Sequence, residues 1–425
     1  MAALDELYFH GNYAEVLASL LSFPYAYNLS KRELYEKVIH DVMEGKAGNI
    51  HPEVYQAYSD NLRKAVGGVF RSDDYGDKYF DLQAQLQSNV SRFAAYKAYH
   101  LTEQLKKQRE KWPDDGDFKN IAKAVLNTFN RYQAAEYNTA TARARTAKQW
   151  TDFNADPIAN ELYPNLRWLP SRSASPREEH QAFYWLVLPK TDLFWRQNQP
   201  GNLWNCKCDW EETDAPIDTK ELKADDLAKA RSEGGGIHAN GLEGNPAVTG
   251  EIFTKECTYF KQAGKNRKQR KQADIEIADK IRPLLEAELK EKLLNKESVC
   301  NINGEEHKVM FISQGISEAA QSMKGTYSYW VKNEILPMIS EYIQKGHLIS
   351  ITESDTTHNT RKQTIKLKER TDYFYYFETI LPNGEKAYIN VGHFKPDHPN
   401  PLKANKYYFY TITKNCPSYK EKRNS

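Results

Sequence analysis

The chain of 425 residues is long enough for two or three domains of ordinary size. Its 59 lysines and arginines nearly balance its 57 aspartates and glutamates, which excludes a strong overall field of the kind that attracts nucleic acid. No apolar run is long enough for a membrane span or a secretory signal, so we expect no membrane partner, and five scattered cysteines fit a reducing cytoplasm better than a disulfide framework.

The first part of the chain is predicted to be helical. Apolar residues recur there every three to four positions, and a capping box, Ser30-x-x-Glu33, precedes the first clear run. Short helices are also expected within residues 1–28. The later predicted helices begin near Ser30, Pro52, residue 77 and Asp117, and the last one runs to about Trp150. Residues 1–150 are therefore predicted to form a helical N-terminal region.

The end of the last predicted helix is rich in alanine, threonine and basic residues. Arg143, Arg145 and Lys148 lie there. One interpretation is a contact with DNA or with an acidic surface of a partner protein. The alternative is a solvated helix face, which is the usual meaning of such a charge run.

The stretch from Leu162 to Asp209 differs from the helices before it. Four tryptophans lie in it, and its prolines and glycine are too frequent for a long helix. We expect buried aromatic rings to hold a loop-rich module together here, within residues 151–260. A short helix is expected around Leu222 to Ala230.

Three residues of this module are candidate ligands of a structural zinc ion. His180, Cys206 and Cys208 supply an imidazole and two thiolates, which zinc prefers. A structural site usually has four ligands, and His238 or Cys257 are the candidates for the fourth. The alternative is that both cysteines are buried packing residues of an aromatic core.

Several residues of this module occur in a characteristic order: Arg167-Trp168, Arg177, His180, Leu188-Pro189, Asp192-x-Phe194-Trp195, Pro200 and Trp204-x-Cys206-x-Cys208, and more loosely Asn245 to Phe253. Their order and spacing resemble the phage Mu F-like minor head proteins, also called the head morphogenesis family. The resemblance implies a virion protein inside the head, near the portal, which is present in the host cytoplasm during assembly or after delivery. Its expected partners are then the phage portal and head proteins.

Beyond the module the chain becomes basic. Residues 261–272 lack large apolar side chains and are predicted to be a basic linker. From Lys255 onwards the chain has 29 lysines and arginines against 21 acidic residues. RNA or packaged DNA is therefore an expected partner of the region that follows.

Residues 273–425 are predicted to be a small α+β domain with an antiparallel sheet. Helices are expected at about 273–294 and 328–345, and Leu381-Pro382-Asn383-Gly384 has the composition of a hairpin turn. The expected strands are 309–312, 347–351, 364–367, 373–380, 386–391 and 407–413. The fold class predicted for the whole chain is α+β multidomain.

This order of elements resembles the toxin-type nucleases of the barnase, EndoU, colicin RNase and RelE group, which often follow Mu F-like modules. The resemblance implies metal-independent cleavage of RNA, which requires a base, an acid and a cation. The candidates are His347, His358 and His393 for proton transfer, Lys324, Arg361 and Lys395 for phosphate, and Tyr327, Tyr410, Thr411 and Thr413 for positioning.

His393 and Lys395 lead this set, because they follow a predicted strand, where a site loop would lie. The alternative for each histidine is an ordinary surface or core residue, and for Lys324 a solvated loop lysine. A domain that binds nucleic acid without cleaving it is the alternative function.

Overall fold

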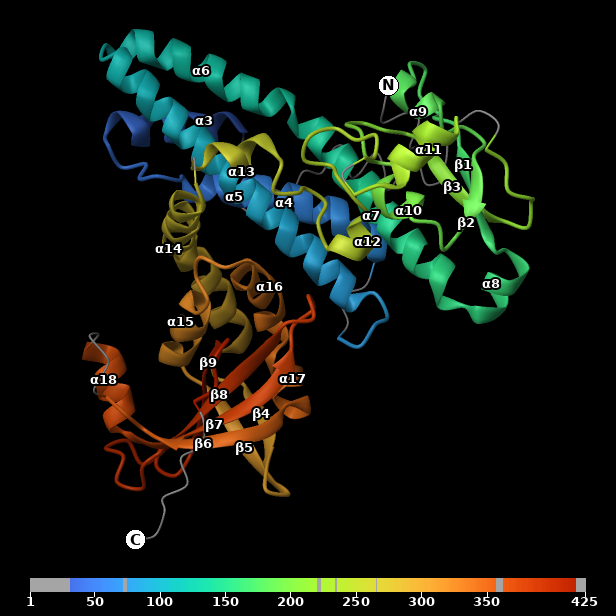
Figure 1. Ribbon diagram of the computed structural model, residues 1–425. Coiled ribbons are helices and arrows are strands. Elements are labelled where there is room, and N and C mark those ends of the chain that lie inside the picture. The colour runs from blue at the N-terminus through green and yellow to red at the C-terminus, as the bar shows by residue number, and fades with distance from the viewer. Residues whose placement is uncertain are drawn as a thin grey trace.

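The computed structural model describes residues 31–71, 75–219, 223–233, 235–264, 266–356 and 362–417. Long helices lie next to a small module on one side and above a larger sheet on another (Figure 1). The predicted α+β fold class is confirmed, with helices in the first half of the chain and the main sheet in the last part. The short helices expected within residues 1–28, and the candidates His358 and Arg361, lie outside the described residues.

Five helices form the helical array of the first half. They are α3 (Lys31–Met43), α4 (Pro52–Phe70), α5 (Phe80–Lys111), α6 (Asp115–Arg131) and α7 (Gln133–Ala155). The predicted helix starts near Ser30, Pro52 and residue 77 are thus confirmed. The single helix predicted to run to Trp150 is wrong, because a turn at Tyr132 divides it. The cap of α6 is Asp114, whose carboxylate accepts from the backbone N–H groups of Gly116 and Asp117.

Small side chains let the helices of this array approach closely. Helix α7 buries Ala140, Ala144 and Ala147, which recur at helical spacing along one stripe. At the middle of α5, Ala94, Ala95 and Ala98 are also fully buried. The threonine-rich and arginine-rich sequence of α7 therefore has one face in the core of the helical array.

The aromatic module contains a short sheet and many loops. Its strands are β1 (Asn165–Leu169), β2 (Val187–Pro189) and β3 (Asp209–Thr213), with β1 in the centre and antiparallel to both neighbours. Trp168, Trp195 and Trp210 are buried together, so the prediction that aromatic rings hold this module is confirmed. Its helices are α8 (Pro157–Leu162), α9 (Glu178–Gln181), α10 (Phe194–Gln197) and α11 (Ala224–Arg231), whereas α12 (Pro246–Thr249) and α13 (Thr258–Gln262) pack on the helical array.

Helix α14 (Arg267–Leu293) connects the first half of the chain to the larger sheet. The predicted basic linker, 261–272, contains the end of α13 and the first turns of α14. Further along, Ile277 and Ile281 pack into the core of the helical array, whereas Leu289 and Leu293 pack into the core under the sheet. One helix therefore contributes to both cores.

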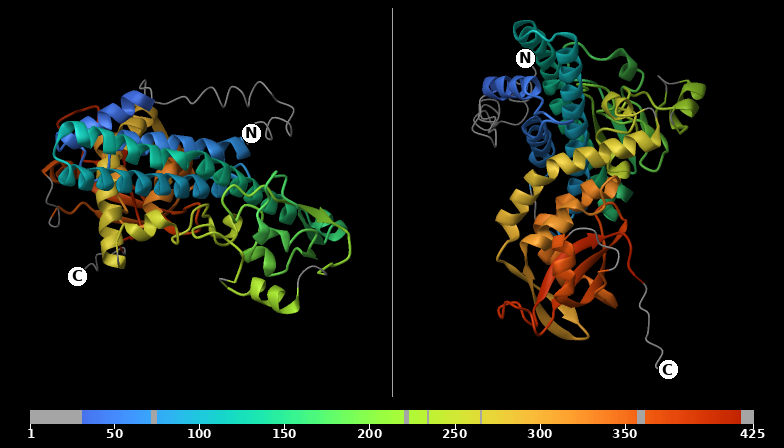
Figure 2. Two further views of the ribbon diagram at one scale, coloured as in Figure 1. Left: turned by 90° about the horizontal axis from the view of Figure 1, so that it is seen from above. Right: turned by 90° about the vertical axis from the view of Figure 1, so that its left-hand side faces the viewer.

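The C-terminal domain has a six-stranded sheet in the order β4-β5-β9-β8-β7-β6. All neighbours are antiparallel except β5 and β9, so the predicted antiparallel sheet is correct apart from one parallel pair. Figure 2 shows this domain at one end of the molecule. Its elements are β4 (Glu297–Ile302), β5 (Glu305–Phe311), α15 (Ser313–Gln321), α16 (Tyr327–Ile335), the 3₁₀ helix η1 (Leu336–Met338), α17 (Ile339–Lys345), β6 (His347–Glu353), α18 (Lys362–Glu369), β7 (Thr371–Ile380), β8 (Lys386–Phe394) and β9 (Tyr407–Thr413).

Three details of this domain differ from the prediction. The strand predicted at 364–367 is helix α18, in which Thr364 is buried and Leu367 packs on the sheet. Strand β4 was not predicted, because only Val299 and Ile302 of its six residues are β-branched, which is a weak strand signal. The helix predicted at 328–345 is interrupted by η1, which contains Pro337.

The two faces of the sheet have different coverings. Apolar side chains of α14 to α17 pack against one face, where Phe377, Val391 and Phe409 lie. The opposite face carries an aromatic cluster that includes Phe394 and Tyr408. Among the described residues, no helix has the length and apolar content that a membrane crossing requires.

Candidate functional site

The three predicted zinc ligands lie together in the aromatic module. His180 belongs to α9, and Cys206 and Cys208 precede β3. Nδ1 of His180 is 3.3 Å from Sγ of Cys206 and 3.8 Å from Sγ of Cys208. The three ligand atoms lie within 4.8 Å of one another. The fold thus brings these three residues into one cluster.

Local backbone geometry aims both sulfurs at His180. Asn205 has a φ of 57°, a left-handed conformation that asparagine tolerates better than most residues. The turn is closed by the backbone N–H of Cys206, which donates to Leu203 at 3.1 Å. The backbone N–H of Arg172 donates to the carbonyl of Lys207 at 3.2 Å, so the loop that follows β1 supports the turn that carries the two cysteines.

The two thiols influence each other strongly. The hydrogen bond from Cys208, with a smaller contribution from His180, holds the pKa of Cys206 well below its usual range despite burial. The same contact, together with burial, raises the pKa of Cys208. The pair therefore favours a single negative charge shared between two sulfurs.

Neither candidate for a fourth ligand belongs to this cluster. Cys257 is buried elsewhere, with its Sγ 3.5 Å from the carbonyl oxygen of Gly241. His238 lies 3.6 Å from the carboxylate of Glu243. Among the described residues, the cluster has three ligands.

A buried arginine joins the helical array to the loops of the module. Arg143 is fully buried, and its guanidinium donates to the side chain of Asn202 at 2.7 Å. It also donates to four backbone carbonyls, of which that of Leu242 is nearest at 2.8 Å. Both interpretations of this residue, a contact with DNA and a solvated face, are therefore wrong. The other three carbonyls belong to Glu243, Gly244 and Glu251.

In the C-terminal domain, the leading candidate His393 has an acidic partner. Its Nδ1 lies 2.9 and 3.0 Å from the two carboxylate oxygens of Asp372. A β-bulge in β7, between Thr371 and Tyr373, turns Asp372 towards the face that carries His393. Both side chains are partly exposed, at 17% and 24%. The carboxylate fixes the orientation of the imidazole and leaves Nε2 as the atom that can exchange a proton with a ligand.

Aromatic rings and a second histidine extend this pair across the sheet. Tyr407 on β9 lies opposite His393 on β8, with their ring centroids 4.6 Å apart. On its other side, Tyr407 contacts the ring of His307 on β5, at 4.8 Å. His307 and His393 therefore lie less than ~10 Å apart in one row with Asp372. We call these four residues the histidine row.

Basic residues border the histidine row. Lys395 follows β8 directly, and its backbone N–H donates to the carbonyl of Arg370, which precedes β7. Lys406 precedes β9, and its carbonyl accepts from Phe394. The backbones of Arg370, Lys395 and Lys406 therefore meet at the end of the sheet where His393 lies.

The other candidate catalytic residues do not join this group. His347 pairs with Glu378, which is five positions along β7 from the partner of His393, about 17 Å in a strand. Lys324 forms an ion pair with Asp279 on α14. Tyr410 and Thr411 are buried in the sheet.

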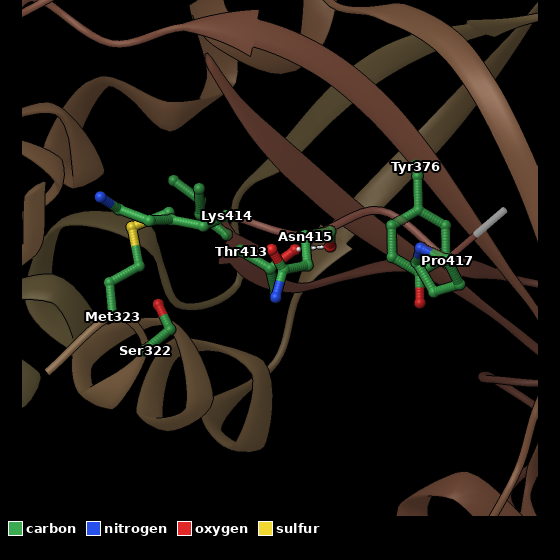
Figure 3. A pocket seen from close by; sticks show the side chains of 8 residues that line it. Ser322, Met323, Tyr376, Thr413, Lys414, Asn415 and Pro417 are labelled. Carbon is green, nitrogen blue, oxygen red and sulfur yellow. Dashed lines mark hydrogen bonds between the residues drawn. The ribbon is translucent and has the colours of Figure 1, made fainter. Parts of the chain in front are cut away.

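Tyr327 and Thr413 also lie apart from the histidine row. The hydroxyl of Tyr327 donates to Gly250 at 3.5 Å, between the domain and the module. Thr413 lines a shallow pocket of about 430 Å³ between the end of α15 and the end of β9 (Figure 3). This pocket lies at the opposite end of β9 from Tyr407, so it is not a substrate cleft for His393.

No pattern in the sequence indicated three members of the histidine row, Asp372, His307 and Tyr407. Asp372 faces His393 only because of a bulge, and the row also requires the register of four strands. His307 and Tyr407 meet through the parallel pairing of β5 with β9, which are distant in sequence. An alternating pattern can indicate which face of a strand a residue occupies, but not which strand is its neighbour.

Comparison with known proteins gives one informative similarity. The chain is 26% identical over 152 residues to "Putative capsid assembly protein F" of Escherichia phage Mu. The similar region is 34% of this chain and 31% of the Mu protein, so the chain matches about a third of that relative's length. No family model and no solved structure matches the chain. The resemblance to phage head proteins is supported in this region, whereas the resemblance to nucleases stays a prediction.

Proposed function

We propose that this chain is a phage head-assembly protein that associates with the portal and becomes part of the virion. The observation that carries the proposal is the similarity to the Mu protein, together with the packing of the residues that bear the resemblance. Trp168, Leu188 and Trp195 belong to one buried core, and His180 and Cys206 adjoin it. A shared sequence pattern that forms one folded unit is what a common assembly module requires.

The surface of the aromatic module supports a role in protein contacts. Seven of the fourteen large apolar side chains that are exposed among the described residues lie in residues 151–260. The largest is Trp185, which is 59% exposed and has a φ of 66°. Exposed aromatic side chains of this kind supply much of the binding energy in protein interfaces.

The proposal is tested with particles from the phage genome that encodes the chain. Deletion of the gene should give aberrant or empty heads in electron micrographs, and mass spectrometry of purified virions should detect the protein in fewer copies than the major capsid protein. Normal infectious heads after deletion, together with absence of the protein from wild-type virions, would contradict the proposal.

A pair of tryptophan variants tests the contact surface. Trp185→Ala should reduce incorporation into particles, with expression and folding unchanged, because its side chain is exposed. Trp112→Ala is the matched control, since Trp112 is exposed outside the module. Equal incorporation of both variants would exclude Trp185 as a contact residue.

A second function, cleavage of RNA by the C-terminal domain, is favoured by the histidine row. His393 has the carboxylate partner that orients a general base, and His307 can act as the acid. The base takes the proton from a ribose 2′-hydroxyl, whose oxygen then attacks the adjacent phosphorus. The bond to the 5′-oxygen breaks, and this oxygen takes a proton from the acid. The products are a 2′,3′-cyclic phosphate and a 5′-hydroxyl end.

The assay measures RNA cleavage in the presence of EDTA. It uses the full chain, because α14 contributes to the cores of both halves and the C-terminal domain is not cut from it. His393→Ala should abolish cleavage, and Asp372→Asn should lower it by about tenfold to a hundredfold, since an orienting partner is lost. His347→Ala is the control, because His347 is exposed at the other end of the strands. If His347→Ala loses cleavage and His393→Ala keeps it, the catalytic site lies near His347 and not in the histidine row. An inactive wild-type chain would leave head assembly as the function.

A further inference from the structure

We infer that His180, Cys206 and Cys208 hold a zinc ion with three protein ligands and a fourth position open to solvent. Zinc bonds of about 2.3 Å to sulfur and about 2.0–2.1 Å to nitrogen place the two ligand atoms about 3.6 Å apart in a tetrahedron. The separations of 3.3 and 3.8 Å lie on either side of this value. Binding therefore requires no rearrangement of the backbone.

The surroundings of His180 leave the lone pair of Nδ1 free to bind a metal ion. Its Nε2 is 3.5 Å from the carbonyl oxygen of Ile237, a position that suits an N–H donor. The lone pair is then on Nδ1, which faces both sulfurs. The ring is buried and also contacts Trp168, at 5.1 Å between centroids, so its orientation is fixed.

A buried donor next to the cluster is an independent sign of a thiolate. The indole N–H of Trp168 is fully buried and has no hydrogen-bond acceptor within normal distance among the described residues. The side chain with which this N–H interacts is the thiol of Cys208. A zinc-bound thiolate accepts N–H groups of this kind, which also tune the metal. Without a charged sulfur, the N–H would be buried at a cost.

The donor set selects the class of metal. Thiolates and imidazole suit zinc and other soft or borderline ions, whereas magnesium and calcium prefer oxygen ligands. Two thiolates also neutralise a divalent charge, which lowers the cost of burying the ion.

The fourth position belongs to water. Cys208 is the least buried of the three ligands, so the open position lies on its side. The ion would connect α9 to the loop before β3, two segments that are 26 residues apart at His180 and Cys206. Its role is to stabilise the aromatic module, with water in place of a fourth protein ligand.

The primary test measures the metal in the full-length chain. After expression with zinc and purification without chelator, elemental analysis should give one zinc ion per chain. X-ray absorption should indicate two sulfur ligands and two nitrogen or oxygen ligands. Replacement with cobalt should produce a thiolate-to-cobalt charge-transfer band. A folded chain that takes up neither zinc nor cobalt would overturn the inference.

Variants identify the ligands. Cys206→Ser and Cys208→Ser should each lower zinc occupancy at least tenfold, and Tyr184→Phe, which removes a hydroxyl beside the sulfurs, should weaken binding several-fold. Cys257→Ala and Cys416→Ala are controls that should retain the ion, because neither side chain belongs to the cluster. Loss of zinc in Cys257→Ala with retention in Cys206→Ser would refute the ligand set.

Discussion

Replacing Arg143 with methionine should loosen the attachment of the aromatic module to the helical array. The guanidinium is fully buried and donates to the Asn202 side chain and to four backbone carbonyls of the segment 242–251. Burial lowers its pKa to about 10, so the arginine remains charged at neutral pH. A methionine of similar length would fill much of the space but would donate nothing.

The size of the effect follows from the carbonyls that lose their donor. Three carbonyls accept within 3.2 Å, and a buried acceptor without a partner costs about 1–3 kcal/mol. Removing the desolvated cation offsets part of this cost. We therefore expect a loss of roughly 3–5 kcal/mol in the free energy of unfolding, and an apparent Tm lower by about 3–6 °C.

Tryptophan fluorescence monitors the unfolding of both variants in denaturant. Limited proteolysis measures how fast the segment 235–251 is cleaved in each. Arg145→Met is the matched control, since Arg145 lies on the same helix but is only partly buried. It should change stability by less than about 1 kcal/mol. If both variants unfold and are cleaved alike, Arg143 does not hold these loops.

For three further substitutions, the structure predicts the direction of the change in stability. Gly392→Ala should destabilise the C-terminal domain by about 1–3 kcal/mol in thermal unfolding, because a Cβ there would overlap the ring of Tyr408. Gly68→Ala, in an open position on α4, should instead stabilise by up to about 1 kcal/mol in the same measurement. Burial lowers the pKa of Lys332 well below its usual value, so the unfolded chain binds the proton more tightly. Stability should therefore rise with pH towards about 10.4, and Lys332→Met should remove this rise in denaturant titrations at several pH values.

The helices were the part of the fold that could be read from the sequence. Their apolar periodicity is local, and the turn at Pro113 to Gly116 marks where α5 ends and α6 begins. The segment 364–367 was predicted incorrectly as a strand, since a short apolar run fits either state until its packing is known. The parallel pairing of β5 with β9 joins segments almost one hundred residues apart, which no local pattern records.

Residue type indicated the cluster of His180, Cys206 and Cys208, because imidazole and thiolate are the ligands that zinc prefers. The same reasoning was less successful in the C-terminal domain, where His393 lies in the row but His347 lies at the far end of the strands. Arg143 illustrates the limit best. Its neighbours in sequence indicated an exposed basic face, and only the loops that fold over α7 bury it.

The two halves of the molecule are joined too closely for the C-terminal domain to be a simple appended cargo. Tyr329 and Trp330 of α16, with Ile277 and Ile281 of α14, are buried in the core of the helical array. Burial of four such side chains contributes roughly 6–12 kcal/mol. The isolated segment Asp274–Ser425 should therefore unfold at a lower temperature than the same domain in the full chain, or associate through this face, as measured by calorimetry and light scattering. An isolated segment that is monomeric and equally stable would mean that the contact contributes little, and the domain could then separate from the head-assembly part without a thermodynamic cost.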